Sequence, residues 1–115
     1  MHEERARALR SELERFVSIV STEMNPERIV LFGSLAHGDV HEWSDLDLVV
    51  VLETDLPFLE RQRRVIHRVC PAISVDFFVY TPKEWEYLKK TQPFIRDEID
   101  AKGRVVYERG VAAVG

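Results

Sequence analysis

Three aspartates in apolar surroundings are the residues of this chain best suited to chemistry. Asp45 and Asp47 stand two residues apart at the start of the apolar run LVVVL, residues 48–52. Side chains at that spacing in a strand share one face of the sheet, so the two carboxylates repel each other. Asp76 interrupts a second apolar stretch, SVDFFVY, residues 74–80, where an unpaired charge is costly. If the two strands are neighbours, the three carboxylates can converge on a cation.

Magnesium is the cation that this pattern predicts. It takes carboxylate oxygens and substrate phosphates together, and three carboxylates can hold two metal ions roughly 3.5–4 Å apart for in-line displacement at phosphorus. The alternative is that the Asp-x-Asp pair lies in water and that Asp76 is an edge-strand charge facing solvent. The preceding Gly33-Ser34, which follows the apolar segment RIVLF, favours the site. A turn there would point free backbone N–H groups at a phosphate.

The elements that must position these residues alternate between strands and helices. Apolar residues recur at helical spacing over residues 3–24, and Asn25-Pro26 ends that helix. Asp55 is expected to cap the second long helix and Ser34 a brief turn closed by Gly38, while TPKE, residues 81–84, has capping-box spacing. The expected strands are 28–32, 45–52, 74–80 and 104–108, and the expected helices are 3–24, 57–69, one from 82 and one over 93–103.

These elements predict an α/β (α+β) fold with a small mixed sheet of three to four strands flanked by helices. We expect one domain, residues 1–115, with an N-terminal helix (1–25), a catalytic core (28–80) and C-terminal helices with a last strand (81–108). The small-residue tail after Gly110 is expected to be loose.

Composition excludes several classes of protein. The chain has 115 residues, of which 45% are hydrophobic and 31% charged, as in globular soluble proteins. No apolar run reaches the length of a membrane span, and residues 2–15 are too charged for a signal peptide, so we expect a cytoplasmic protein. The single cysteine, Cys70, excludes an internal disulfide and a cysteine metal site. A net charge of −4 argues against a broad nucleic-acid surface.

The pattern Gly33-Ser34, ten residues, then Asp45-Leu46-Asp47 resembles the signature of the DNA polymerase β-like nucleotidyltransferase superfamily. With SDLDLVVVL and the later VDFFVY, the chain looks like the minimal nucleotidyltransferase branch of that superfamily. The resemblance extends from residue 29 to about residue 108 and includes PFIRDEIDAKGRVVYER. One departure is Ala36-His37-Gly38, where the family often has arginine in the middle position.

The resemblance implies a role for each matching residue. Gly33, Ser34 and Ser44 would contact the nucleotide, whereas Asp45, Asp47 and Asp76 would be catalytic and would bind two Mg²⁺ ions. Asp76 would also help to deprotonate the acceptor hydroxyl. The implied reaction is transfer of AMP from ATP to a hydroxyl, such as a tyrosine of a HEPN-domain toxin encoded beside this protein. The chain would then act as an antitoxin in a hetero-oligomer.

Two competing functions stay open at this level. The chain could be a non-catalytic module that blocks a HEPN-domain partner by contact, or an adenylyltransferase for a small molecule such as an aminoglycoside. Relatives of the second kind generally carry an additional acceptor domain.

Four other features have simpler readings. His37 and His41 are expected to be loop histidines rather than a zinc pair. Arg61, Arg64 and Arg68 could share a helix face that is either solvated or a partner surface. Cys70 is expected to be a packed thiol. Trp43 could border the nucleotide pocket or pack its loop.

Overall fold

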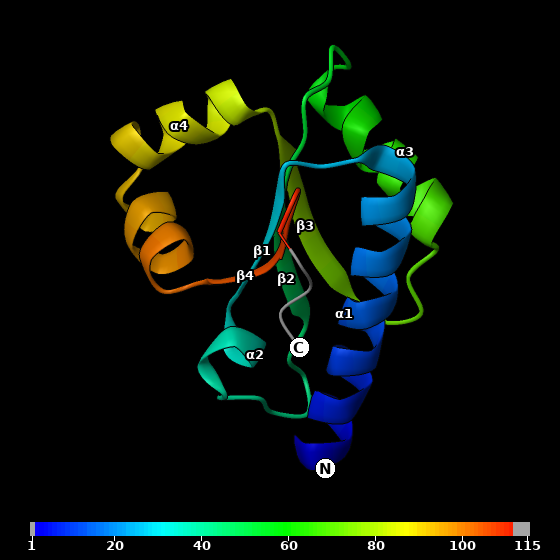
Figure 1. Cartoon of the computed structure of the whole chain (residues 1–115). Helices are drawn as coiled ribbons and strands as arrows, with labels where there is room; N and C mark the ends of the chain where they lie inside the picture. Colours follow the sequence, from blue (N-terminus) through cyan, green and yellow to red (C-terminus); the bar gives the residue numbers. More distant parts are fainter. Residues whose placement is uncertain (1, 112–115) are drawn as a thin grey trace.

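The computed structural model describes residues 2–111, so most of the tail that was expected to be loose lies outside the described residues. Its helices and strands follow the predicted order closely (Figure 1). In chain order they are α1 (His2–Met24), β1 (Arg28–Phe32), α2 (Ser34–His37), β2 (Leu46–Val51), α3 (Phe58–Val69), β3 (Val75–Tyr80), α4 (Pro82–Thr91), η1 (Ile95–Ala101) and β4 (Arg104–Glu108).

The four strands form one mixed sheet in the order β3-β2-β1-β4. β1 pairs antiparallel with both β2 and β4, whereas β2 and β3 run parallel. A parallel pair needs a long crossover, which α3 provides. The predicted fold class is therefore confirmed, and the order makes β3 and β4 the edge strands.

Helices cover both faces of the sheet (Figure 1). α1 and α3 lie against one face, and α4 with η1 lies against the other. Successive strand residues point to opposite faces, so Leu48 and Val50 join the core under α1 and α3, while Val49 and Val51 join the core under α4 and η1. Burial on both faces explains why β2 is a continuous apolar run after its acids.

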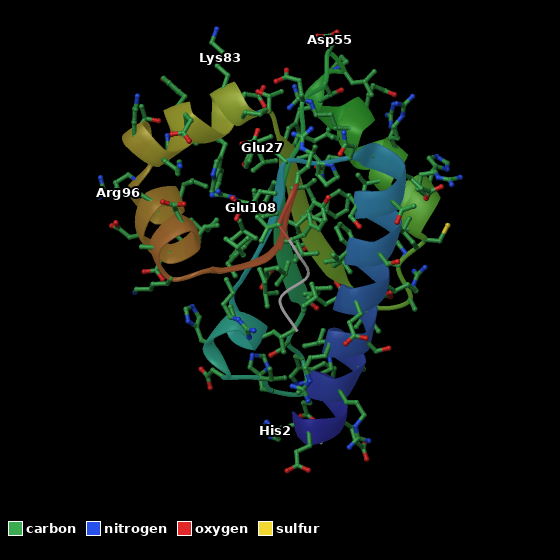
Figure 2. All side chains as sticks on the ribbon, in the orientation of Figure 1. His2, Glu27, Asp55, Lys83, Arg96 and Glu108 are labelled. Carbon is green, nitrogen blue, oxygen red and sulfur yellow. The ribbon has the colours of Figure 1, made fainter. Side chains whose placement is uncertain are left out.

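Helix ends confirm one predicted cap and correct two others. Thr81 and Glu84 form both hydrogen bonds of the capping box, with Pro82 as the first residue of α4. α3 has no side-chain cap: Pro57 occupies the cap position, and Asp55 lies at the tip of the preceding loop (Figure 2). Similarly, Gly33 rather than Ser34 precedes α2, and it makes no side-chain cap.

The segment predicted as a last α-helix is a π-helix, η1, in which each turn is wider than an α-helical turn. Its Ile99 is buried against Val30 and Val49, which places η1 over the sheet. Among residues 2–111, none of the helices combines the length and the apolar character that a membrane crossing requires.

Candidate active site

The parallel pairing of β2 with β3 brings two of the predicted acids side by side. Asp47 and Asp76 are register partners on the two strands, and both belong to the sheet face that α4 and η1 cover. Asp45 immediately precedes β2 and completes the acidic end of the strand. The expectation that the second and third strands are neighbours is thus confirmed.

The pKa of Asp47 reflects the burial of its side chain and the two neighbouring negative charges. Burial, followed by the negative charges of Asp76 and Asp45, raises the pKa of the Asp47 carboxyl from 3.8 to about 6. Each of these effects disfavours the ionised form of the side chain. Asp47 accepts no hydrogen bond and forms no ion pair within residues 2–111, so the acidic end of the sheet lacks an internal counter-charge for it.

Gly33 leaves the space that the Asp47 carboxylate occupies. A Cβ atom built on Gly33 would lie 2.2 Å from Oδ2 of Asp47, and the φ of Gly33 is +77°. A side chain at position 33 would therefore collide with the carboxylate and strain the backbone. The glycine of the predicted phosphate turn and the aspartate of the predicted metal pair are in direct contact, although they lie fourteen positions apart in the sequence.

The two predicted serines have different surroundings. Ser34 begins α2, whose first N–H groups have no partner within the helix. Ser44 is buried, and its hydroxyl accepts a hydrogen bond from the backbone N–H of His41 at 2.9 Å. The structure gives the Ser44 hydroxyl a part in holding the loop, and the nucleotide contacts of both serines stay predictions.

Arg5 is a site residue that the sequence did not indicate. Its Nε donates a hydrogen bond to the carbonyl oxygen of Ser44 at 2.9 Å, and its terminal nitrogen lies 3.9 Å from the Asp45 carboxylate. The first turn of α1 also contributes His2, whose ring nitrogen lies 3.0 Å from the carbonyl oxygen of Val40. The start of α1 therefore anchors the loop that carries Asp45. One arginine in a charged helix gives no sequence signal for such a contact.

The residues at this end of the sheet fit magnesium in their donor chemistry. Asp45, Asp47 and Asp76 offer only carboxylate oxygens, which Mg²⁺ prefers, and the Asp47 carboxylate lies against Gly33, where no side chain competes for the space. Within the described ranges, no three His, Cys, Asp or Glu side chains already form a cluster able to hold a metal ion.

The other residues singled out in the sequence divide between structural and exposed positions. The Trp43 ring is 78% exposed, so it does not pack the loop. His41 accepts a hydrogen bond from the backbone N–H of Trp43 and stands in a loop, as predicted, whereas His37 is the last residue of α2, which corrects the loop prediction for that histidine. Cys70 is exposed, which corrects the prediction of a packed thiol. It has a left-handed backbone conformation at the end of α3.

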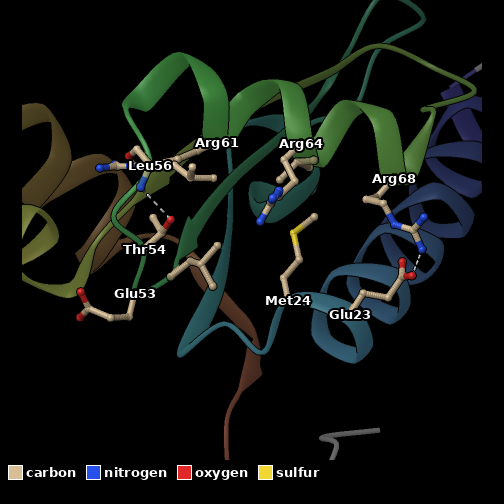
Figure 3. A pocket seen from close by; sticks show the side chains of 10 residues that line it. Glu23, Met24, Glu53, Thr54, Leu56, Arg61, Arg64 and Arg68 are labelled. Atoms are coloured by element: carbon tan, nitrogen blue, oxygen red, sulfur yellow. Dashed lines mark hydrogen bonds and ion pairs between the residues drawn. The ribbon is translucent and has the colours of Figure 1, made fainter.

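Three of the four arginines of α3, namely Arg61, Arg64 and Arg68, line a cavity of about 400 Å³ at the opposite end of β2 (Figure 3). Arg61 is buried and paired with Glu84, so the solvated-face reading is wrong for this residue. Arg68 pairs with Glu23. The cavity also contains Glu53, so its lining carries both signs of charge.

Comparison with known proteins identifies the family. Residues 13–107 match the nucleotidyltransferase domain family. A curated relative from Methanocaldococcus jannaschii, "Putative protein adenylyltransferase MJ0141", is 36% identical over 56 residues, which are 47% of this chain and 56% of the relative. The chain thus spans about half the length of that relative.

The fold has a match among solved structures. The crystal structure of a protein from Sulfolobus solfataricus, described as a putative nucleotidyltransferase, superposes with a TM-score of 0.66. The match covers 97% of this chain and 90% of the other at 23% identity, which shows a shared fold. The family match includes both strands that carry the acids. The chain therefore belongs to the nucleotidyltransferase domain family.

Proposed function

We propose that this protein transfers AMP from ATP to a hydroxyl group of a protein acceptor, with Mg²⁺ held by Asp45, Asp47 and Asp76. The observation that carries the proposal is the pairing of Asp47 with Asp76 on parallel strands, in contact with Gly33. The name of the Methanocaldococcus jannaschii relative, a putative protein adenylyltransferase, supports a protein as the acceptor. By the family resemblance, a HEPN-domain toxin is the proposed partner and the chain its antitoxin.

Each site residue has a role in the proposed reaction. The amides at Gly33 and Ser34 bind the triphosphate, and Asp76 accepts the proton of the acceptor hydroxyl. The acceptor oxygen attacks the α-phosphorus, one P–O bond forms, and the bond to the departing pyrophosphate breaks. Bound Mg²⁺ would supply charge neutralisation for the phosphates. The protein contributes mainly by positioning, since strand pairing holds Asp47 and Asp76 in register and Asp45 directly precedes β2.

The raised pKa of Asp47 is consistent with a site awaiting a cation. Two carboxylates in register repel each other unless a positive charge lies between or beside them. Arg5 partly compensates Asp45 but forms no ion pair with Asp47. A divalent ion would relieve the repulsion that burial of Asp47 makes strong.

The test is label transfer from ATP labelled at the α-phosphate, with Mg²⁺ and the purified product of the neighbouring gene as acceptor. Replacing any one of the three acids by asparagine is expected to lower transfer at least about 100-fold, as loss of a metal ligand does. Asp55→Asn, in an exposed loop away from the site, is the matched control and should retain full transfer.

Two results would contradict the proposal. The first is label transfer that survives in the Asp47→Asn and Asp76→Asn variants. The second is neutralisation of the partner by all three variants without any transfer, which would leave the protein as a binding module.

A further inference from the structure

A groove beside the two paired acids is lined mostly by apolar side chains. It is a cavity of about 530 Å³ at the β3 edge of the sheet, and Asp47 and Asp76 form part of its wall. Phe78 of β3, Phe94 before η1 and Ile66 of α3 line it as well. We call this cavity the β3 groove. Any group held in it is next to the proposed reaction centre.

The apolar walls of the β3 groove are open to solvent. Phe94 is 61% exposed, Ile66 50% and Phe78 39%. From Phe78 an aromatic row continues through Tyr80 to Phe58, with ring centroids 6.1 and 5.9 Å apart. Contiguous apolar surface of this kind is typical of binding sites rather than of a free surface.

The edge of β3 limits how a partner can bind. The side-chain amide of Gln62 donates to the carbonyl oxygen of Phe77 at 2.8 Å and accepts from the N–H of Val79 at 3.1 Å. Arg61 donates to the carbonyl oxygen of Val79 at 3.1 Å. These bonds occupy the backbone groups that an added strand would need there. A partner must therefore insert side chains into the groove instead of extending the sheet.

The charges of the β3 groove limit the chemistry of the partner. Among the described residues that line it, Asp47 and Asp76 are the only charged ones. An acidic segment or a nucleic-acid backbone would meet like charge in the metal-free protein. With metal bound, it would compete with the phosphates of the nucleotide. The occupant that complements this groove is apolar and carries no carboxylate.

We propose that the β3 groove is the docking surface for the acceptor protein, which inserts an apolar, non-acidic segment and so brings its hydroxyl to Asp47 and Asp76. This inference rests on the proposed function and adds to it the location of the acceptor and the side-chain chemistry of the docking segment. Nucleotide and acceptor then approach the acids from different sides, with α2 on one side and the β3 groove on the other.

Binding is tested first, without metal or nucleotide, on the isotopically labelled full chain by NMR. The probe is an acetylated and amidated peptide of leucine, phenylalanine and lysine with one central tyrosine. A second peptide has glutamate in place of each lysine, and a third has glutamine in place of the apolar residues. We expect the first peptide to shift resonances of β3 and η1, and each of the other two to bind at least about fivefold more weakly.

Variants then test the groove itself. Phe94→Ser and Phe78→Ser are each expected to weaken binding of the first peptide at least about fivefold. Leu59→Ser is the matched control, because Leu59 is 67% exposed on α3 and lies outside the groove, and it should change binding less than about twofold. The melting temperature of each variant is compared with that of the wild type, so that weaker peptide binding can be distinguished from unfolding.

Several results would overturn the groove as the docking surface. They are absence of peptide binding, equal binding of the glutamate peptide, an equal loss in Leu59→Ser, and shifts confined to a different cavity, which Leu13 and Val17 of α1 and Val105 of β4 line. Transfer to the acceptor protein that persists in the Phe78 and Phe94 variants would also overturn it while leaving the proposed function intact. Peptide binding in the groove without any transfer would instead contradict the proposed function and leave the groove as a binding surface.

Discussion

At one end of β2, Asp47 lies beside Asp76 with its charge uncompensated, whereas at the other end Arg61 has a complete set of partners. Arg61 donates to Glu84 at 2.7 Å and to the carbonyl oxygens of Leu56 and Val79. That hydrogen bonding holds the pKa of Glu84 below its usual 4.5, while burial and like charge hold that of Asp47 above its usual value.

The difference separates charges that stabilise the fold from charges kept for another purpose. A buried arginine persists because each of its donors is satisfied. A half-buried aspartate next to a second carboxylate destabilises the folded chain by itself, so its presence points to a ligand. A pKa that burial and a neighbouring charge have shifted is characteristic of functional sites. Four predictions test this difference and are given in order of decreasing expected effect.

Arg61→Met should lower the free energy of unfolding by about 3 kcal/mol, because Glu84 and two carbonyl oxygens lose their donor. Urea denaturation measures the change. Arg63→Met is the matched control, since Arg63 forms an exposed pair with Glu60 on the same helix and should cost less than about 0.5 kcal/mol. Equal losses in the two variants would contradict the stabilising role of Arg61.

Gly33→Ala should destabilise the protein by about 2 kcal/mol and abolish most transfer, because the new methyl group meets the Asp47 carboxylate. Gly38→Ala is the comparison variant. Gly38 has φ +73° and ψ +20°, an ordinary left-handed conformation, and no atom lies within 4 Å of the added Cβ, so its replacement should cost about 1 kcal/mol. Gly33 has φ +77° and ψ −157°, a conformation essentially restricted to glycine, so equal losses in the two variants would show that neither this backbone conformation nor the contact with Asp47 adds to the cost.

Asp47→Asn should stabilise the metal-free protein at pH 7 by about 1–2 kcal/mol, a value reduced from the full pKa shift for solvent screening. The folded-state pKa is raised, so the wild-type protein should lose stability as the pH rises from about 4 through about 6. The variant should lack that decline. Urea denaturation of the wild type and the variant, in the presence of EDTA at several pH values, measures this decline. A wild-type free energy of unfolding that stays constant over this pH range would contradict the prediction.

Glu84→Gln should have the smallest effect, under about 1 kcal/mol, because the Glu84 side chain is 44% exposed. The pKa of Glu84 is lowered, so its contribution is present above pH 4.5 and is lost as the pH falls further. The variant should therefore unfold at acidic pH with a weaker pH dependence than wild type. If the free energy of unfolding of the variant falls at acidic pH as much as that of the wild type, Arg61 depends on its carbonyl partners alone.

The sequence by itself determined the local elements and the candidate acids. The capping box at Thr81 and Glu84, the strand boundaries and the Asp45-Leu46-Asp47 pair are short-range features, which depend on residues within about one helical turn or strand. Where no local cap forms, as at Asp55, the sequence prediction was wrong. There Pro57 occupies the cap position and no side-chain cap forms.

Tertiary structure decided which of those residues meet. Parallel pairing placed Asp76 in register with Asp47, although Asp76 itself is exposed on the edge strand β3, and the packing of α3 brought Arg61 to Glu84 over twenty-three residues. Arg5 reached Ser44 across thirty-nine residues, and Gln62 covered the edge of β3. These contacts depend on strand order and on the faces that the helices cover. Neither is encoded in local propensity, because both minimise exposed apolar area and unpaired polar groups over the whole sheet.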